Sequence, residues 1–374
     1  MASLRMIYAY LSVFLMSIAN QITNCSGNRC LLHEKEASLF VFGDSLFDAG
    51  INNYLSPSFP ANKANYPPYG QTFFNYPSGR FSDGRIIPDF IAEYAKLPLI
   101  LPYLHPDSEH YYVYGINFAS AGAGALVETS PPEYVLDLNT QVSYYKNVSN
   151  VLRKKLGNAE AKAFFSKAVH LVSIGANDYG ARFGSNSSVF LRYSQQQFID
   201  IVIGNLTTAI KEIHTIGGRK FGFVNVGPAG CSPGAKMIVN GTKGACDEKL
   251  LEVARIHNDE FSRMLLKLEK QLDGFKYSVF DFYDSALQVM KYPSKYGFKE
   301  GSVACCGGGP YRGDNSCGGK RGIKKYKLCK NVSEYLFFDS AHPTDKANQL
   351  LSQLMWSGNL TVNKPYNLRQ LFRF

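Results

Sequence analysis

Long apolar runs are scarce in this chain of 374 residues. The first one, from Met6 to Ile18, is too short to span a bilayer comfortably. It follows Arg5 and precedes polar residues, which is the layout of a secretory signal peptide; a buried N-terminal helix is the alternative. No later segment is long and apolar enough to be a membrane anchor. We therefore expect residues 1–26 to be a signal peptide and the product to be secreted and extracellular, without a stable membrane anchor.

Paired Cys-x-x-Cys motifs are also absent, and no histidine interrupts the cysteine-rich stretch between residues 305 and 329. Zinc sites need ligands at such spacings, so we expect no metal there. In an oxidising compartment, cysteines in loops without regular structure form disulfides. The cysteines expected to do so are Cys231, Cys246, Cys305, Cys306, Cys317 and Cys329. Cys25 and Cys30 have no obvious partner.

Sequons of the form Asn-x-Ser/Thr agree with export and predict a glycoprotein. They begin at Asn24, Asn147, Asn186, Asn205, Asn240, Asn331 and Asn359. Asn24 lies near the expected cleavage zone, and Asn205 falls within a predicted helix, which disfavours its use.

Acidic residues are outnumbered, and the net charge is +10. The densest basic run consists of Lys320, Arg321, Lys324, Lys325, Lys327 and Lys330. Its default interpretation is a solvated face. A second interpretation is weak association with acidic extracellular polymers or a membrane surface. Nucleic acid is not expected as a partner, because a secreted, glycosylated chain with no recognisable binding motif does not fit that class.

Linkers, internal repeats and low-complexity tracts are missing, so residues 27–374 are expected to form a single domain. Apolar runs at 38–42, 169–174, 221–226 and 277–282 predict strands. Helical periodicity appears between them, at 199–216 and 250–268, and a last helix is expected from about Thr344 to Trp356. Strands that alternate with helices predict an α/β fold with a parallel sheet covered on both faces. Functional sites of such sheets lie at the carboxyl ends of the strands.

Two segments almost three hundred residues apart carry complementary chemistry. Ser45 follows the first strand directly, but a serine needs a base before it can act as a nucleophile. Asp339 precedes His342 by three residues, so it can reach Nδ1 of the imidazole and leave Nε2 free to take a proton. The alternative is an ordinary helix start with Thr344 as its cap, which leaves the histidine unexplained.

Three other motifs are weaker candidates. Gly230–Gly234 matches Gly-x-Ser-x-Gly, but Pro233 follows the serine and has no N–H to offer an oxyanion, so we interpret the segment as a surface loop. Asp107–His110 repeats the Asp-x-x-His spacing within a polar stretch, and a surface loop is again expected. His257 lies on an apolar helix face, which is typical of a core residue.

Four blocks in fixed order identify the constellation: 42–50 (Phe-Gly-Asp-Ser-Leu-Phe-Asp-Ala-Gly), 117–124, 175–178 (Gly-Ala-Asn-Asp) and 339–342 (Asp-Ser-Ala-His). They resemble the GDSL lipase/esterase family of SGNH hydrolases, and the wording around 76–85 is similar to its plant secreted branch. The resemblance extends from about Ser38 to Phe374. It implies a flavodoxin-like three-layer α/β/α sandwich with a parallel sheet of about five strands.

The resemblance also implies roles for individual residues. Ser45 is the expected nucleophile, His342 the general base and then general acid, and Asp339 the residue that holds the imidazole. The N–H groups of Ser45 and Gly122 and the side-chain amide of Asn177 are expected to face the oxyanion. Ala121 departs from the second glycine that many members carry there. No metal or organic cofactor is implied.

The expected function is that of a serine esterase or lipase that hydrolyses carboxylic esters, with a lipid or an acylated plant metabolite as substrate. Acyl transfer to an alcohol uses the same residues and stays open. A catalytically silent binding protein is a third class, disfavoured by the intact set. The insertions 52–75 and 305–329 are expected to shape the pockets. The aromatic residues of the first insertion either line an acyl groove or, as we favour, pack; they are Tyr54, Phe59, Tyr66, Tyr69, Phe73 and Phe74.

Overall fold

The structure is a computed structural model that describes residues 37–55, 62–184, 192–239 and 244–374. The expected signal peptide, the cysteines at 25 and 30, and the sequons at 24, 186 and 240 lie outside the described residues. Within the described ranges, none of the helices has the length and apolarity that crossing a bilayer requires.

A five-stranded sheet with the order β1-β2-β3-β4-β7 forms the centre of the fold. Four of its strands run parallel: β1 (Leu39–Gly43), β2 (Val169–Ser173), β3 (Lys220–Val224) and β4 (Lys276–Phe280). The predicted strands are thus confirmed within two residues at their ends. The fifth strand, β7 (Asn363–Lys364), pairs antiparallel with β4 and was not predicted.

The strands are apolar throughout because helices cover both faces of the sheet. All five residues of β1 are buried, and its side chains alternate between two cores. Phe40 and Phe42 belong to one core cluster, whereas Leu39 and Val41 belong to the other. Along the outer edge of β1, the Val41 N–H donates to the Ile116 carbonyl, and this contact brings the block 117–124 beside the first strand.

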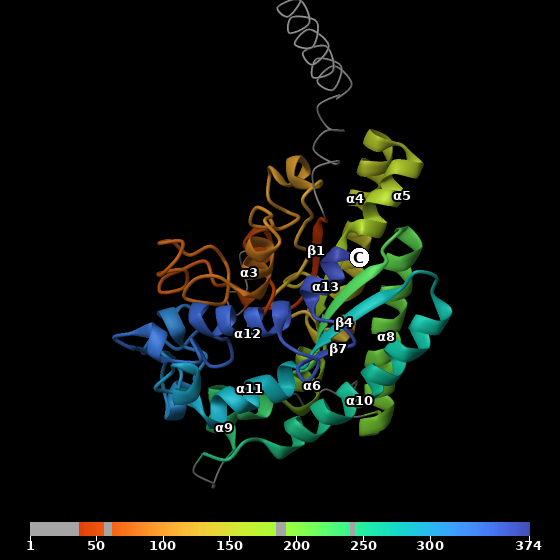
Figure 1. Ribbon diagram of the computed structural model, residues 1–374. Coiled ribbons are helices and arrows are strands. Elements are labelled where there is room, and N and C mark those ends of the chain that lie inside the picture. The colour runs from red at the N-terminus through yellow and green to blue at the C-terminus, as the bar shows by residue number, and fades with distance from the viewer. Residues whose placement is uncertain (1–36, 56–61, 185–191, 240–243) are drawn as a thin grey trace, which may run out of the picture. The chain divides into compact units, whose positions relative to one another are not determined.

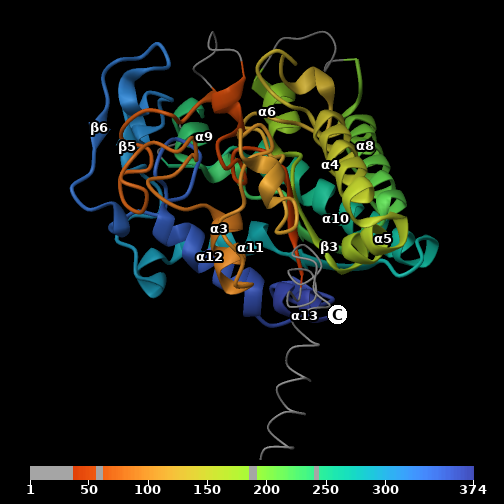
Figure 2. The same ribbon diagram turned by 90° about the horizontal axis from the view of Figure 1, so that it is seen from above.

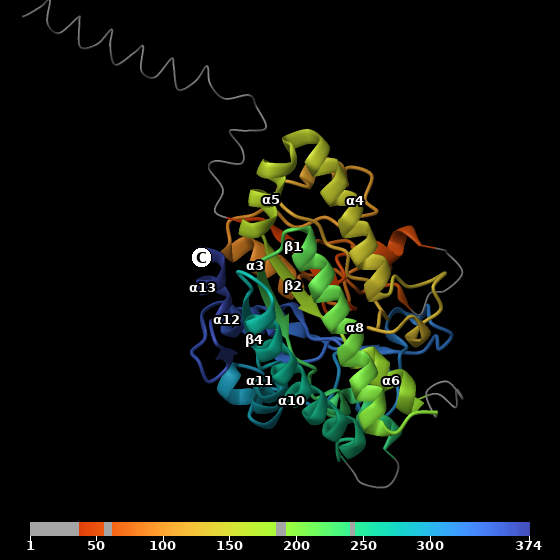
Figure 3. The ribbon, with the colours of Figure 1, turned by 90° about the vertical axis from the view of Figure 1, so that its right-hand side faces the viewer.

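Two sets of helices make the outer layers, and Figure 1 shows the sheet between them. The first set is α4 (Leu138–Leu156), α5 (Asn158–Lys167), α8 (Gln195–Ile216) and α10 (Glu248–Gln271). Figure 3 views the molecule from the side of α8 and α10. The second set is α3 (Ile87–Tyr94), α11 (Phe282–Lys291), α12 (Asp345–Ser357) and α13 (Leu368–Arg373). The predicted three-layer α/β/α sandwich is confirmed, with a mostly parallel sheet of five strands.

The three predicted helices are confirmed as α8, α10 and α12. Thr344 caps α12 as expected, because its hydroxyl accepts the Ala347 N–H. Two shorter helices, α6 (Ala176–Gly184) and α9 (Pro233–Ile238), follow β2 and β3. Short 3₁₀ turns occupy Ile51–Tyr54, Ser108–Tyr111, Val127–Thr129, Ala229–Cys231, Pro293–Tyr296, Pro310–Arg312, Cys317–Gly319 and Val332–Glu334.

Disulfides join the six cysteines for which they were predicted. The bonds are Cys231–Cys246, Cys305–Cys329 and Cys306–Cys317. The last two close a loop that contains the small antiparallel ribbon of β5 (Cys306–Gly307) and β6 (Lys327–Leu328). Figure 2 shows this ribbon away from the central sheet, on the same side as α9. We call residues 305–329 the stapled loop.

Candidate active site

Ser45 lies in the turn that follows β1, where it is half-buried. The turn begins at Gly43, where a Cβ atom would lie 2.4 Å from the Ser173 carbonyl oxygen, so the strand end tolerates only glycine. The Asp44 carboxylate then accepts the Leu46 N–H at 3.0 Å and fixes the turn. Burial raises the pKa of Asp44 to about 7.

His342 joins Ser45 to Asp339 through its two ring nitrogens. Nε2 lies 2.8 Å from the Ser45 hydroxyl oxygen, and Nδ1 lies 2.7 Å from Asp339 Oδ1. The same oxygen of Asp339 accepts the backbone N–H groups of Ala341 and His342, which closes the turn between the two residues. Phe81 packs against the imidazole with its ring centroid 4.7 Å away. The structure therefore brings together the serine, histidine and aspartate that the sequence predicts.

Asp339 is buried but remains ionised. Burial alone opposes its ionisation, yet its pKa is lowered below the ordinary value because His342, Arg321 and a hydrogen bond from Tyr69 together outweigh that cost. An ionised carboxylate at this position favours the tautomer with the proton on Nδ1 and leaves Nε2 as the base.

The other two predicted residues, Gly122 and Asn177, lie at the same site and keep hydrogen-bond donors available for a ligand. In the part of the chain that the structure describes, no acceptor takes the N–H of Ser45 or of Gly122. Asn177, near the start of α6, donates one Nδ2 hydrogen to the Ala123 carbonyl at 2.9 Å. An amide nitrogen carries two hydrogens, so one remains for a ligand. Gly122 has φ +88°, a conformation that favours glycine.

Two buried carboxylates, which the sequence analysis assigned no role, bind the backbone within the block 117–124 and just after it. Asp48 accepts the Ala121 N–H at 2.9 Å, and Asp178 accepts the N–H groups of Ala125 and Leu126 at 2.9 and 3.0 Å. Burial raises the pKa of each carboxyl group to about 6. Both belong to the recognised motifs, but their positions in the sequence do not indicate which backbone groups they bind.

A cavity of about 630 Å³ opens beside these groups. Ser45, Gly122, Asn177 and His342 all line it. Its wall is largely apolar and includes Phe81, Phe183, Met237, Ile238, Leu250, Phe282, Ala286, Met290, Leu336, Phe337 and Leu351. Residues 282, 286 and 290 recur every four positions on α11 and so present one face of that helix to the cavity.

The two insertions contribute less to this wall than the sequence analysis predicted. Asn62 lines the cavity from the first insertion, and Gly313 and Asn315 line it from the second. The described aromatic residues of 52–75 do not line it. Tyr66 and Tyr69 instead pack in a core cluster, as the favoured interpretation predicted, whereas Tyr54 and Phe73 are exposed and do not. Phe59 lies outside the described residues.

Gly230–Gly234 was wrongly predicted to be a surface loop. It forms a 3₁₀ turn and the start of α9, and it lines the cavity. Ser232 caps α9 by accepting the Ala235 N–H, which explains the serine without catalysis. The Gly234 N–H donates to the Ser340 carbonyl at 2.8 Å, so α9 packs against the turn that carries His342.

The other two weak candidates are as predicted. Asp107 and His110 are exposed at a 3₁₀ turn. His257 is buried, its Nδ1 lies 2.6 Å from the Tyr179 hydroxyl, and burial lowers its pKa to about 3.

Comparison with known proteins assigns the chain to a family. The family described as GDSL-like Lipase/Acylhydrolase matches residues 39–355. The chain is 49% identical over 374 residues to GDSL esterase/lipase 2 of Arabidopsis thaliana, covering 99% of this chain and 98% of the relative. It is 48% identical to GDSL esterase/lipase 4 of the same plant, with 100% of both chains covered. A GDSL lipase of Tanacetum cinerariifolium is 47% identical over 343 residues, or 92% of this chain and 90% of that one. The chain therefore belongs to the GDSL-like lipase/acylhydrolase family and is a carboxylic ester hydrolase.

Proposed function

We propose that the protein hydrolyses carboxylic esters through an acyl-enzyme on Ser45. The observation that carries the proposal is the chain of contacts from Ser45 through His342 to Asp339, with distances of 2.8 and 2.7 Å. These are hydrogen-bond distances for a nucleophile and its base, and the base is in turn oriented by a carboxylate.

The reaction proceeds in two matched halves. His342 Nε2 takes the Ser45 proton as Oγ forms a bond to the ester carbonyl carbon, and Asp339 stabilises the imidazolium without taking a proton. The N–H groups of Ser45 and Gly122 and the Asn177 amide donate to the oxyanion. The imidazolium then gives its proton to the leaving alcohol as the carbon–oxygen bond breaks. Water repeats the sequence and releases the acid.

The cavity supports an ester with an extended apolar part as substrate, either a lipid or an acylated plant metabolite. Its volume of about 630 Å³ lies within the range of small-molecule sites, and most of its wall is apolar. Burial of each methylene contributes about 0.8 kcal/mol, so a long acyl chain gains most from such a wall. An alcohol in place of water would give acyl transfer, and incubating acyl esters with and without alcohols, with products identified by mass, separates the two outcomes.

Turnover of an ester by serine variants tests the proposal. Ser45→Ala should abolish turnover and leave the fold intact, because the side chain is half-buried and only its hydroxyl is removed. Ser232→Ala is the matched control, since it lines the same cavity but caps α9. A large loss of turnover in the control, or retention in Ser45→Ala, would show that another group is the nucleophile.

We also propose that the protein is secreted as a glycoprotein. Three disulfides support an oxidising compartment, and the sequons at Asn331 and Asn359 are exposed outside the helices, whereas Asn147 lies within α4, which disfavours its use. Expression in a secreting plant cell should release a protein whose N-terminus lies near residue 27 and whose mass falls on deglycosylation. Retention of an intact, unglycosylated chain would contradict this.

Weak association with acidic extracellular polymers is the remaining part of the proposal. The lysines of the basic run are exposed, so their charges are available to a polyanion; they are Lys320, Lys324, Lys325, Lys327 and Lys330. Retention on a polygalacturonate column that disappears at high salt would support the association, and absence of retention at low salt would contradict it.

A further inference from the structure

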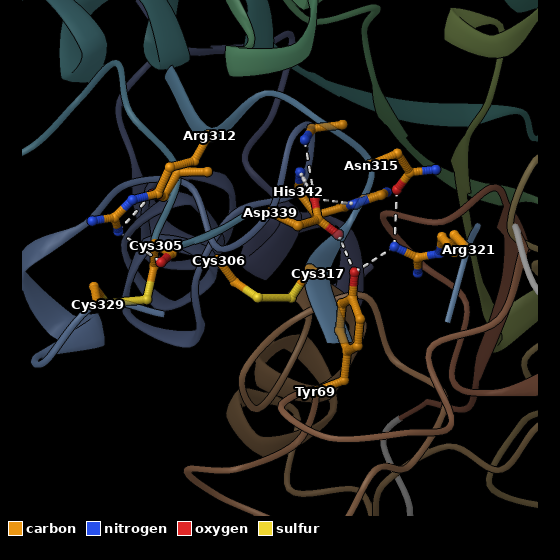
Figure 4. The surroundings of a disulfide bond; sticks show 12 residues. Tyr69, Cys305, Cys306, Arg312, Asn315, Cys317, Arg321, Cys329, Asp339 and His342 are labelled. Carbon is orange, nitrogen blue, oxygen red and sulfur yellow. Dashed lines mark hydrogen bonds and ion pairs between the residues drawn. A yellow bond between two sulfur atoms is a disulfide. The ribbon is translucent and has the colours of Figure 1, made fainter. Parts of the chain in front are cut away.

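The carboxylate of Asp339 is held from both sides. Its Oδ1 faces the ring of His342, whereas its Oδ2 accepts the Tyr69 hydroxyl at 2.6 Å. Tyr69 is buried and comes from the first insertion, 270 positions away in the sequence. Figure 4 shows its hydroxyl between Asp339 and Arg321.

Arg321 is the one member of the predicted basic run that does not lie on a solvated face. Its Nη1 donates to the Tyr69 hydroxyl at 2.8 Å and to Asn315 Oδ1 at 2.9 Å, and its Nη2 donates to the Lys63 carbonyl at 2.8 Å. Its guanidinium also lies against the ring of Tyr66, 5.5 Å from the centroid. The other five basic residues of the run are exposed.

The chemistry of the two groups fixes the direction of the Tyr69 hydrogen bond. A guanidinium can only donate, so the phenolic oxygen must accept from Arg321. The single phenolic hydrogen is then available for Asp339, which as a carboxylate can only accept. Arg321 thus ensures that Tyr69 presents a donor to the acid.

We propose that Tyr69 and Arg321 are positioning residues, which hold the Asp339 carboxylate so that its Oδ1 faces His342. The inference rests on the proposed roles of Asp339 and His342. Neither Tyr69 nor Arg321 lines the cavity, so both act through Asp339 and not on the substrate.

The stapled loop provides the rigidity that positioning requires. Arg321 lies between Cys317 and Cys329, whose disulfide partners are Cys306 and Cys305. The N–H groups of those two partners donate to the carbonyls of Phe338 and Phe337, at 2.7 and 2.9 Å. Phe337 and Phe338 directly precede Asp339. The two disulfides therefore tie the part of the loop that carries Arg321 to Cys305 and Cys306, which hydrogen-bond to the residues that lead to Asp339.

The charge environment of Asp339 favours the ionised carboxylate that faces His342. The groups that face it are His342 on its own turn, Tyr66 and Tyr69 from the first insertion, and Arg321 from the stapled loop. Burial raises the pKa of the carboxyl group, and His342, Arg321 and Tyr69 lower it further than burial raises it. Loss of Tyr69 or Arg321 should therefore shift the pKa of Asp339 upward, toward its ordinary value, and leave the carboxylate less firmly held beside His342.

Steady-state kinetics of Tyr69→Phe, Arg321→Met and Arg321→Lys test the inference. Each of the first two removes a hydrogen bond that serves a carboxylate, so kcat should fall about tenfold or more with little change in KM. Arg321→Lys keeps a charge and a donor and should recover part of kcat. Arg312→Met is the matched control, because Arg312 donates to the Ala304 and Cys305 carbonyls in the same loop and should leave kcat nearly unchanged.

Coupling to Asp339 gives the decisive comparison. In an Asp339→Asn background, measured with an activated aryl ester, Arg321→Met should cause no further fall in kcat, because the carboxylate it helps to hold is gone. An equal fall in both backgrounds, or an unchanged kcat in Tyr69→Phe, overturns the inference. Should Arg321→Met fail to fold, Tyr69→Phe and Arg321→Lys carry the test.

Failure of the positioning role can be distinguished from failure of the proposed function. If Asp339→Asn lowers kcat while the Tyr69 and Arg321 variants do not, only the positioning role fails. If Ser45→Ala retains turnover, the proposed function itself fails.

Discussion

Asp48 and Asp178 decide where the backbone around Gly122 lies. One binds the N–H of Ala121, and the other binds the N–H groups of Ala125 and Leu126, so the segment is anchored on either side of Gly122. The Gly122 N–H is left without an acceptor among the described residues. A donor fixed in advance stabilises a developing charge without reorganisation during the reaction.

Asn177→Ala should lower kcat by about a hundredfold or more with little change in KM, because removal of one oxyanion donor typically costs that much. Steady-state kinetics with an activated ester measure the change. Asn53→Ala is the control, because its Nδ2 also donates to a carbonyl, that of Ser78, but it does not line the cavity. Equal losses in the two variants would mean that Asn177 acts through stability and not through the oxyanion.

At the scale of elements, the four parallel strands could be predicted because each is a continuous apolar run. The strand β7 could not be predicted, since two residues, Asn363 and Lys364, show no periodicity. The helix α9 was missed because Pro233 and Gly234 are typical of loops. Proline also suits the first position of a helix, and Ser232 before it is a good cap. That pair of signals would have identified the helix.

The face that α11 presents to the cavity should determine which acyl chains are accepted. Ala286→Phe would project a ring between Phe282 and Met290, so kcat/KM for long-chain esters should fall about tenfold or more while acetyl esters change little. A series of aryl esters of increasing chain length measures this. Gln288→Phe, on the exposed side of the same helix, is the control. A uniform loss across chain lengths would contradict an acyl-binding role.

At the scale of the whole molecule, the resemblance of four motifs in fixed order to the GDSL family implied that Ser45, Gly122, Asn177, Asp339 and His342 share one site. It could not find Tyr69 or Arg321. Both make contacts that span more than 250 positions, and Arg321 lies in a run of lysines that share its charge but not its burial. Such pairings depend on how the disulfides fold the stapled loop, which residue spacing alone does not determine.

Stability should depend on pH through buried groups across the molecule. Burial raises the pKa of Asp44 to about 7 and that of Asp83 to about 6, whereas it lowers the pKa of His170 to about 3. A carboxyl group whose pKa is raised by folding causes no loss of stability below its pKa in the unfolded chain, about 4. As pH rises from there through its pKa in the folded protein, the free energy of unfolding falls progressively. Buried His170 has the opposite pH dependence. In the unfolded chain it takes up a proton as pH falls below about 6.5, whereas in the folded protein it stays neutral down to about 3, so the free energy of unfolding falls over that range.

Asp44→Asn isolates one of these contributions, because the amide oxygen can still accept the Leu46 N–H but cannot titrate. Relative to the unmodified protein, the variant should gain free energy of unfolding between about pH 4 and pH 7, with no further gain above. Urea unfolding at a series of pH values measures the difference. A difference independent of pH would contradict the raised pKa of Asp44.

Covalent labelling of the folded protein by a fluorophosphonate tests the nucleophile most directly. The reagent phosphonylates only a serine whose proton is removed by a neighbouring base, and mass spectrometry of the peptides locates the adduct. The adduct should lie on Ser45 and should disappear in His342→Ala. Labelling of a different serine, or undiminished labelling of Ser45 without His342, would contradict the account.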